Sequence, residues 1–411
     1  MLVTNDTLDW ESVGAFLYPP PTTEPLFPKL RYLSATGSAK IQIVHLLYMP
    51  FPSFISLVLS FSDENQDALH GSLKSVFKFS PKLRRLTINL PRPNITFVNF
   101  FSSYIRRWGD LHTVDCCRIP LDVDALAHLS HMPGLTQLSC TPSATLPASS
   151  SGLPLLFPNL HRLKLHSQFL RPISQLLSCI RLPVLTDLTT SIQDWPSKQC
   201  FTFFLASVRA SVVGHTIQEL RFEGGFGTED AENIENPNAG RLVLGFEDLQ
   251  PCTAFSKLRR LDLDFGWYVD LTDNELLTLA KAWPHLERLF INEEWGWGIA
   301  GGITPNGLLQ LLQTCRSLSD IALTIDVRGF TEFREAPGSL GLTLPPTFSI
   351  NVLDSHIEET SVPAIAAFLA AIAPCPNFLF TACGVYMGRS DHGARWYDAY
   401  RRANDALSQR S

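Results

Sequence analysis

The segment FSKLRRLDL, residues 255–263, carries the pattern on which the fold prediction rests. Its Leu258, Leu261 and Leu263 follow the spacing Leu-x-x-Leu-x-Leu, behind a bulky apolar residue. Alternating apolar residues are typical of a strand with one buried face, so these leucines are expected to point into a core. The residues between them then point the other way.

The same phrase recurs along the chain at a spacing of about 29 residues, which indicates internal repeats. Other clear copies are FPKLRYL from Phe27, SPKLRRLTI from Ser80, FPNLHRLKL from Phe157 and WPHLERLFI from Trp283. Including weaker copies, the first apolar anchors are Leu30, Phe54, Leu83, Leu111, Leu135, Leu160, Leu185, Ile217, Leu258, Leu286 and Leu318. Each unit is long enough to hold one strand and a returning helix.

The segments between the phrases carry apolar residues at the spacing of an amphipathic helix. Examples are Phe97, Phe100, Phe101, Tyr104 and Ile105; Ile173, Leu176, Leu177 and Ile180; Phe201, Phe204, Leu205 and Val208; Leu276, Leu279, Ala280 and Trp283; Leu308, Leu311, Leu312 and Cys315. Thr304-Pro305 is a helix start, with a capping residue followed by proline.

Strand, turn and helix in repetition predict an α/β leucine-rich-repeat solenoid, a horseshoe of parallel strands and returning helices. We expect one domain over residues 27–411 and interpret residues 1–26 as a short N-terminal segment, the return half of a truncated repeat. A doubly wound α/β domain would need Gly-rich strand-to-helix turns, and Gly224-Gly225-Phe226-Gly227 is the one candidate. Because acidic sequence follows it, we predict that residues 224–240 form an exposed insertion outside the repeats.

Composition and the absence of targeting motifs narrow the function. The chain has 33 Lys and Arg against 39 Asp and Glu, a net charge of −6, which argues against nucleic acid as a partner. No signal peptide is visible and prolines interrupt every long apolar stretch, so we expect no membrane association and a cytoplasmic or nuclear location. An odd number of cysteines, 9, fits reduced thiols better than a disulfide framework.

No motif points to an enzyme, a metal or a cofactor. Phosphate-loop, HExxH, CxxC and GxSxG motifs are missing. The nearest metal-ligand set is Cys116, Cys117, His128, His131 and Cys140, which we interpret as packed or surface residues. Asp391-His392 lacks a nucleophile placed by any motif, so we expect a helix cap there.

The end of the chain contains, in order, the segments AWPHLERLFI, TPNGLLQLLQTCRSLSDIALTIDVRG, INVLDSHIEETSVPAIAAFLAAIAPCPN and WYDAYRRANDAL. This order resembles the carboxy-terminal half of the fungal F-box/leucine-rich-repeat proteins. The resemblance covers the repeat region, and a Leu-Pro-x-Glu-Ile F-box phrase is not seen near the start. It implies a protein-interaction module that selects targets for an F-box type ubiquitin ligase, with a cullin-RING ligase adaptor as a second partner if an F-box is supplied upstream. The alternative is a free-standing scaffold or inhibitor unconnected to ubiquitination.

Candidate binding residues come from two places. The outward positions of the strand phrases form a wall of mixed charge, which matches a protein partner better than a nucleic acid; they include Arg162, Lys164, Arg260, Asp262 and Arg288. Aromatic residues follow three neighbouring phrases at equivalent positions: Phe226, then Trp267 and Tyr268, then Trp295 and Trp297. We predict an aromatic rim there, with at least one of Trp295 and Trp297 exposed and binding the partner.

Overall fold

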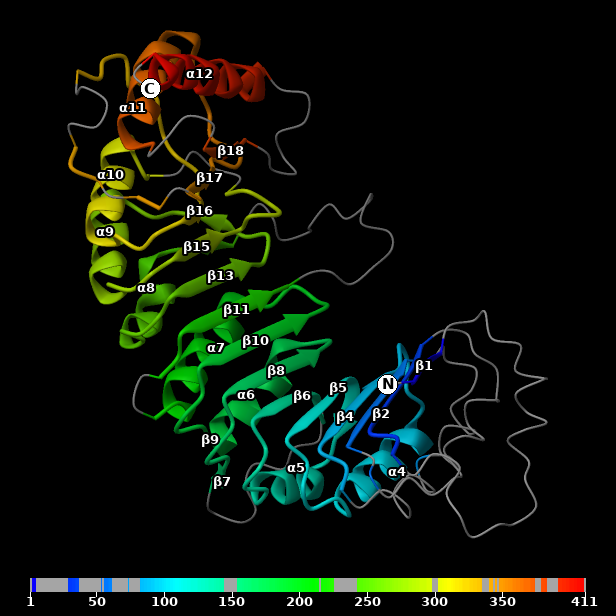
Figure 1. Cartoon of the computed structure of the whole chain (residues 1–411). Coiled ribbons are helices and arrows are strands. Elements are labelled where there is room, and N and C mark those ends of the chain that lie inside the picture. The colour runs from blue at the N-terminus through cyan, green and yellow to red at the C-terminus, as the bar shows by residue number, and fades with distance from the viewer. Residues whose placement is uncertain are drawn as a thin grey trace. The chain divides into compact units, whose positions relative to one another are not determined.

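The computed structural model describes residues 2–4, 29–36, 53, 55–60, 73, 82–143, 154–213, 216–224, 242–297, 302–334, 340–342, 344–345, 347–373, 378–382 and 391–409 (Figure 1). The chain forms two compact units. The first comprises Met1–Ser167, Arg171–Leu185 and Ala210–Gly214, and the second comprises Gln168–Leu170, Thr186–Arg209 and His215–Ser411. The expectation of a single domain over residues 27–411 stays a prediction.

The first unit is a parallel sheet whose strands follow one another in chain order. They are β1 (Leu2–Thr4), β2 (Tyr32–Thr36), β3 (Ser56–Ser60), β4 (Arg85–Asn89), β5 (Thr113–Leu121), β6 (Gln137–Pro142) and β8 (Arg162–Ser167). A short pair, β7 (Leu155–Leu156) and β9 (Ile180–Arg181), lies outside this sheet. The helices are α4 (Ile95–Ile105), α5 (Val123–Ser130) and α6 (Leu170–Cys179), which begins in the second unit.

The second unit repeats the arrangement. Its parallel strands are β10 (Asp187–Ile192), β11 (Glu219–Glu223), β13 (Arg260–Asp264), β15 (Arg288–Ile291), β16 (Asp320–Ala322), β17 (Ser349–Asn351) and β18 (Leu379–Thr381). Strands β12 (Val243–Leu244) and β14 (Tyr268–Val269) form a separate pair. The helical elements are α7 (Lys198–Ser211), α8 (Phe246–Leu249), η3 (Gln250–Ala254), α9 (Asp273–Ala282), α10 (Pro305–Thr314), η4 (Glu359–Ser361), α11 (Val362–Ile372) and α12 (Asp391–Ser408).

The predicted leucines form the core and are aligned from strand to strand. In the second unit Leu188, Leu220, Leu261, Leu289 and Ile321 are successive register partners, and each is at most 1% exposed. In the first unit Leu86, Val114, Leu138 and Leu163 are aligned in the same way. In-register parallel strands alternating with helices define the class: an α/β leucine-rich-repeat fold, as predicted.

The helices cover one face of each sheet, because their apolar stripes match the inward leucines. In Figure 1 α9 and α10 lie side by side along the sheet of the second unit, leaving the outward strand positions on the other side. Helix α10 begins at the predicted Thr304-Pro305 pair, where the Thr304 hydroxyl accepts a hydrogen bond from the Gly307 N–H at 3.3 Å. Helix α4 begins in the same way at Asn94, whose side chain accepts from the Phe97 N–H at 2.7 Å.

We expect Leu261→Ala to destabilise the protein by about 3 kcal/mol, because it leaves a cavity at a fully buried site. The matched control is Leu379→Ala on β18, where the same leucine side chain is 66% exposed and the expected loss is below about 1 kcal/mol. Urea unfolding of both variants measures the difference. Equal losses would contradict the assignment of Leu261 to the core.

Candidate functional site

The candidate site is the outward strand face of the second unit. The register places Glu219, Arg260, Arg288 and Asp320 side by side on β11, β13, β15 and β16. Neighbouring parallel strands lie about 4.8 Å apart, so these charged side chains form one continuous row. The leucine at the next position of each strand points into the core, which fixes the row on the outward face.

A polar groove of about 270 Å³ runs over this row. We call it the charged groove; it is lined by Asp187, Gln218, Glu219, Arg259, Arg260, Glu287, Arg288, Ser319 and Asp320. It includes two of the predicted binding residues, Arg260 and Arg288. The predicted Asp262 lies next to it, on the same face of β13, and is half-buried.

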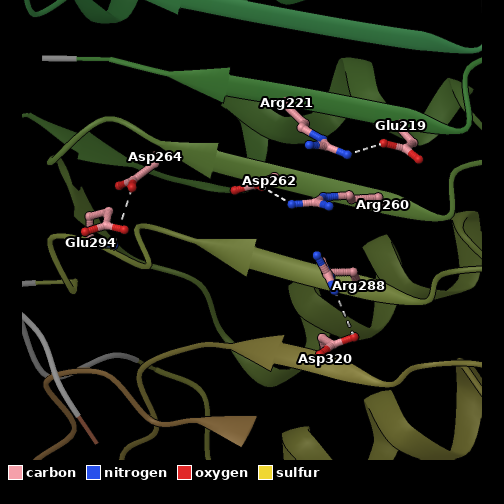
Figure 2. Close-up of polar contacts among 8 residues, drawn as sticks. All are labelled: Glu219, Arg221, Arg260, Asp262, Asp264, Arg288, Glu294 and Asp320. Atoms are coloured by element: carbon pink, nitrogen blue, oxygen red, sulfur yellow. Dashed lines mark hydrogen bonds and ion pairs between the residues drawn. The ribbon is translucent and has the colours of Figure 1, made fainter. Parts of the chain in front are cut away.

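Each arginine of this face is held by a carboxylate (Figure 2). Arg260 pairs with Asp262 at 2.9 Å, and Arg288 pairs with Asp320 at 3.4 Å. The other two ion pairs of the face are Arg221–Glu219 and Arg259–Glu287. Like charges directly opposite one another destabilise a sheet, so the carboxylates offset the repulsion between neighbouring Arg260 and Arg288. The groove is therefore close to neutral although it is lined by charges.

Asp264, Glu293 and Glu294, which have no ion-pair partner among the described residues, lie at the carboxyl end of the same strands, beside Asp262, which is paired with Arg260. We call these four residues the carboxylate cluster. Asp264 ends β13 and is 6% exposed; its Oδ2 accepts a hydrogen bond from the Glu294 N–H at 3.4 Å, while its Oδ1 is buried and has no donor in the described part of the chain (Figure 2).

The cluster alters the protonation of its own members. Burial raises the pKa of Asp264 to about 7, and the neighbouring charges of Glu294, Asp262 and Glu293 contribute, against the lowering effect of the Glu294 hydrogen bond. The pKa of Glu293 is also raised, first by burial and then by Asp262 and Glu294, while Arg288 and Arg260 oppose the shift. Near neutral pH, the Asp264 carboxyl group is therefore protonated in part of the molecules and ionised in the rest. The alternating strand pattern places Asp264 on the outward face with Asp262, and it does not predict that Asp264 is buried.

The aromatic rim is the main correction to the sequence analysis. Trp297 is 0% exposed, and its Nε1–H donates to the Ile291 carbonyl at 2.9 Å. Trp267 is 1% exposed and packs against Phe201 and Phe265 at ring separations of 5.4 and 4.8 Å. Both indoles thus belong to the core, because the turn before Trp297 directs the chain inward. The prediction that at least one of Trp295 and Trp297 is exposed therefore does not hold for Trp297.

The two remaining rim residues that the structure describes, Tyr268 and Trp295, are half-buried. Trp295 meets Trp195 edge to face at 5.1 Å, and both rings lie against Gly266, whose φ is +60°. A Cβ at Gly266 would lie 2.5 Å from the Trp195 ring, so this contact requires glycine. Sequence reasoning missed Trp195, since it follows β10 and no repeat phrase connects it with Trp295.

The predicted residues Arg162 and Lys164 lie on β8 in the first unit and are exposed. Beside them His166 is half-buried, and burial together with the charge of Lys164 lowers its pKa to about 4, with Arg118 acting in the same direction and Asp115 against it. His166 is therefore neutral at physiological pH. Their role in binding stays a prediction, as does that of the residues in the second unit.

Other candidate features give no site in the described residues. No group of His, Cys, Asp or Glu there could hold a metal ion, and no described helix is long and apolar enough to cross a membrane. Cys116 and Cys140, from the set considered for metal binding, are register partners in β5 and β6, and burial raises the pKa of both thiols. Of the expected insertion at 224–240, residues 225–240 lie outside the described residues.

Comparisons with known proteins add little beyond the fold. No family model matches the chain, and no curated protein matches it. Among solved structures, an internalin from Listeria monocytogenes is 16% identical with a TM-score of 0.35, covering 76% of this chain and 87% of that one. The leucine-rich-repeat protein LegL7 from Legionella pneumophila is 12% identical with a TM-score of 0.32, covering 91% and 97%. The structure of the Rad7 and Elc1 complex in yeast is 13% identical with a TM-score of 0.32, covering 82% of this chain and 74% of that one.

Trp297→Ala is expected to lower the free energy of unfolding by about 4 kcal/mol, since it empties a fully buried indole site. Trp295→Ala removes the same side chain from a half-buried position and serves as the comparison, with a smaller loss. Urea unfolding gives both values. An unchanged stability of Trp297→Ala would restore the interpretation of Trp297 as an exposed contact residue.

Asp264→Asn is expected to be more stable than the wild type above neutral pH. The pKa of Asp264 is about 7 in the folded state against 3.8 ordinarily, so its stabilising contribution is complete below about pH 4 and is lost as the pH rises through 7. The advantage of the variant therefore grows between about pH 4 and 7, by up to about 4 kcal/mol, and is constant above that range.

Urea unfolding at several pH values tests this, with Asp326→Asn as the control. A hydrogen bond from Arg328 lowers the pKa of Asp326 below 3.8, so the effect of that substitution should not change between about pH 5 and 8. A flat difference for Asp264→Asn would show that Asp264 is ionised throughout this range.

Proposed function

We propose that the chain is a protein-interaction module and that the outward strand face of the second unit, with the charged groove at its centre, binds the partner. The observation that carries this proposal is the row of arginines held in place by Asp262, Asp320, Glu219 and Glu287. Guanidinium groups fixed before binding lose little conformational entropy on association, and arginine is enriched at protein interfaces. Phe290, under the Arg288 guanidinium at 5.2 Å, adds an apolar contact surface.

The charges of the groove favour a protein over other classes of partner. A groove for nucleic acid keeps one positive sign along its length, whereas this one combines Arg259, Arg260 and Arg288 with Asp187, Glu219, Glu287 and Asp320. Sites for small molecules are mostly apolar and deeply enclosed. Alternating charges on an open strand face instead suit a folded or extended polypeptide of complementary pattern.

For the cellular role, we propose the substrate-recognition part of an F-box type ubiquitin ligase component, in the cytoplasm or nucleus and without catalytic activity of its own. The resemblance of the C-terminal repeats to fungal F-box/leucine-rich-repeat proteins supports it. Affinity purification of the full-length natural protein, probed for the cullin-RING adaptor, tests this role. Recovery of partners without the adaptor would favour the alternative, a free-standing scaffold or inhibitor.

A photo-crosslinking phenylalanine analogue at Phe290 is expected to capture the partner, because that side chain lies on the strand face. The same analogue at Phe203, which is 50% exposed on α7, is the matched control and should capture it at least about tenfold less. Mass spectrometry identifies the captured protein, which is then produced for binding measurements. Equal capture from both positions would contradict binding at the strand face.

The purified partner should bind Arg260→Ala/Arg288→Ala about tenfold or more weakly than the wild type, because both guanidinium groups lie in the groove. The control, Arg401→Ala/Arg402→Ala, removes two arginines of α12 that pair with Asp398. Calorimetric titration compares the dissociation constants. The same loss in both double variants would show an effect of net charge alone.

A further inference from the structure

The charges of the strand face are unevenly balanced. Every arginine of the groove has a carboxylate partner, but no ion pair within the described residues joins Asp264, Glu293 or Glu294 to a cation. Glu223, the register partner of Asp264 on β11, adds a further carboxylate beside the cluster. The charged groove and the carboxylate cluster are therefore adjacent surfaces of different character: every arginine of the first is paired, whereas three of the four carboxylates of the second have no ion-pair partner among the described residues.

An acidic patch alone would be an ordinary solvated surface, but Asp264 makes this one different. Asp264 is 6% exposed, and its Oδ1 faces no donor in the described part of the chain. An unpaired buried polar group costs free energy, and more so when it is charged. The Glu294 N–H offsets part of this cost through its hydrogen bond to Oδ2, and a cation arriving at the cluster would offset more of it.

The accessible members of the cluster could receive such a cation. Glu294 is exposed and Glu293 is half-buried, and both follow β15. Glu294 lies beside Asp264 (Figure 2). They can contact an incoming group directly, while Asp264 forms the floor and responds through its charge. No group of His, Cys, Asp or Glu among the described residues could hold a metal ion.

We propose that the carboxylate cluster recognises a lysine or arginine side chain of the partner protein, placed beside the charged groove. This inference rests on the proposed function, and it adds the chemistry that determines specificity. The neutralised groove would accommodate many polypeptides with little discrimination, whereas a cluster with three unpaired carboxylates favours a basic residue at one position and repels an acidic one.

The cluster also makes recognition depend on pH. The charged groups that act on Asp264 are Asp262 on its own strand and Glu293 and Glu294 after β15. Glu223 on β11 is its register partner, and Arg260 and Arg288 act on Glu293. The charged groups that act on Asp264 itself are all acidic, and they favour its protonated form. A bound ammonium or guanidinium group favours the ionised form, so binding should release a proton and strengthen as the pH rises through neutrality.

The test uses the full chain and a short fluorescent glycine–serine peptide carrying several lysines, compared with the same peptide carrying glutamines. Fluorescence anisotropy at low ionic strength measures binding. We expect the lysine peptide to bind about tenfold or more tightly than the glutamine peptide. Glu293→Gln/Glu294→Gln should remove most of that preference.

The matched control, Glu247→Gln/Asp405→Asn, also removes two carboxylates, both exposed on helices. It should keep the preference of the wild type. If both double variants weaken binding alike, or if neither does, attraction is diffuse or absent and the proposed cation site is wrong.

The pH dependence gives an independent readout. Affinity of the wild type for the lysine peptide should rise at least about threefold between about pH 6 and 8, and Asp264→Asn should abolish that rise. An unchanged pH dependence in Asp264→Asn would overturn the role of Asp264. The proposed function can fail separately from the cation site. If a partner is captured from Phe290 but the cluster variants do not change its affinity, only the cation site is wrong. If the lysine peptide binds selectively but no partner binds the strand face, the proposed function is wrong.

Discussion

The buried ladder of apolar residues is the constraint on which the remaining structure depends. Leu188, Leu220, Leu261, Leu289 and Ile321 occupy one register position on successive strands of the second unit. A slip of one residue in any strand would turn its apolar side chains to the outside and its charges inward. The cost of that exchange holds every strand in register, and it thereby determines which outward side chains become neighbours.

The charge pattern of the strand face follows from this fixed register. Arg260 and Arg288 are opposite one another because Leu261 and Leu289 are, and not because the arginines attract. Their repulsion is offset by ion pairs with Asp262 on the same strand and with Asp320 on the next. The charges of the groove are therefore neighbours because the core sets the register, and the ion pairs offset their repulsion. The same ion pairs fix the guanidinium groups before any partner binds.

The periodic sequence pattern predicted the strands, the helices and the outward strand positions, but not the side-chain contacts made in the turns. Repeated phrases were enough to predict the parallel strands, the helices at Phe97 and Leu308, and the outward positions of Arg260, Asp262 and Arg288. They could not predict the burial of Trp297, whose N–H donates to Asp354 at 2.9 Å across 57 positions of sequence. Gly296, with a φ of +76°, lies against the same Asp354 carboxylate. No local pattern reports such a contact.

One residue of that turn accounts for both the buried aromatics and the unpaired carboxylates. Asn292 has a φ of 55°, a conformation that asparagine tolerates better than most residues. Its side chain is fully buried, where it donates to the Trp267 carbonyl and accepts from the Phe265 N–H at 3.2 Å. The chain is thereby held beside β13 as it leaves β15, so that Trp297 enters the core while Glu293 and Glu294 are left over Asp264. The left-handed turn that fills the core with an indole therefore also assembles the carboxylate cluster, and the two features cannot vary independently.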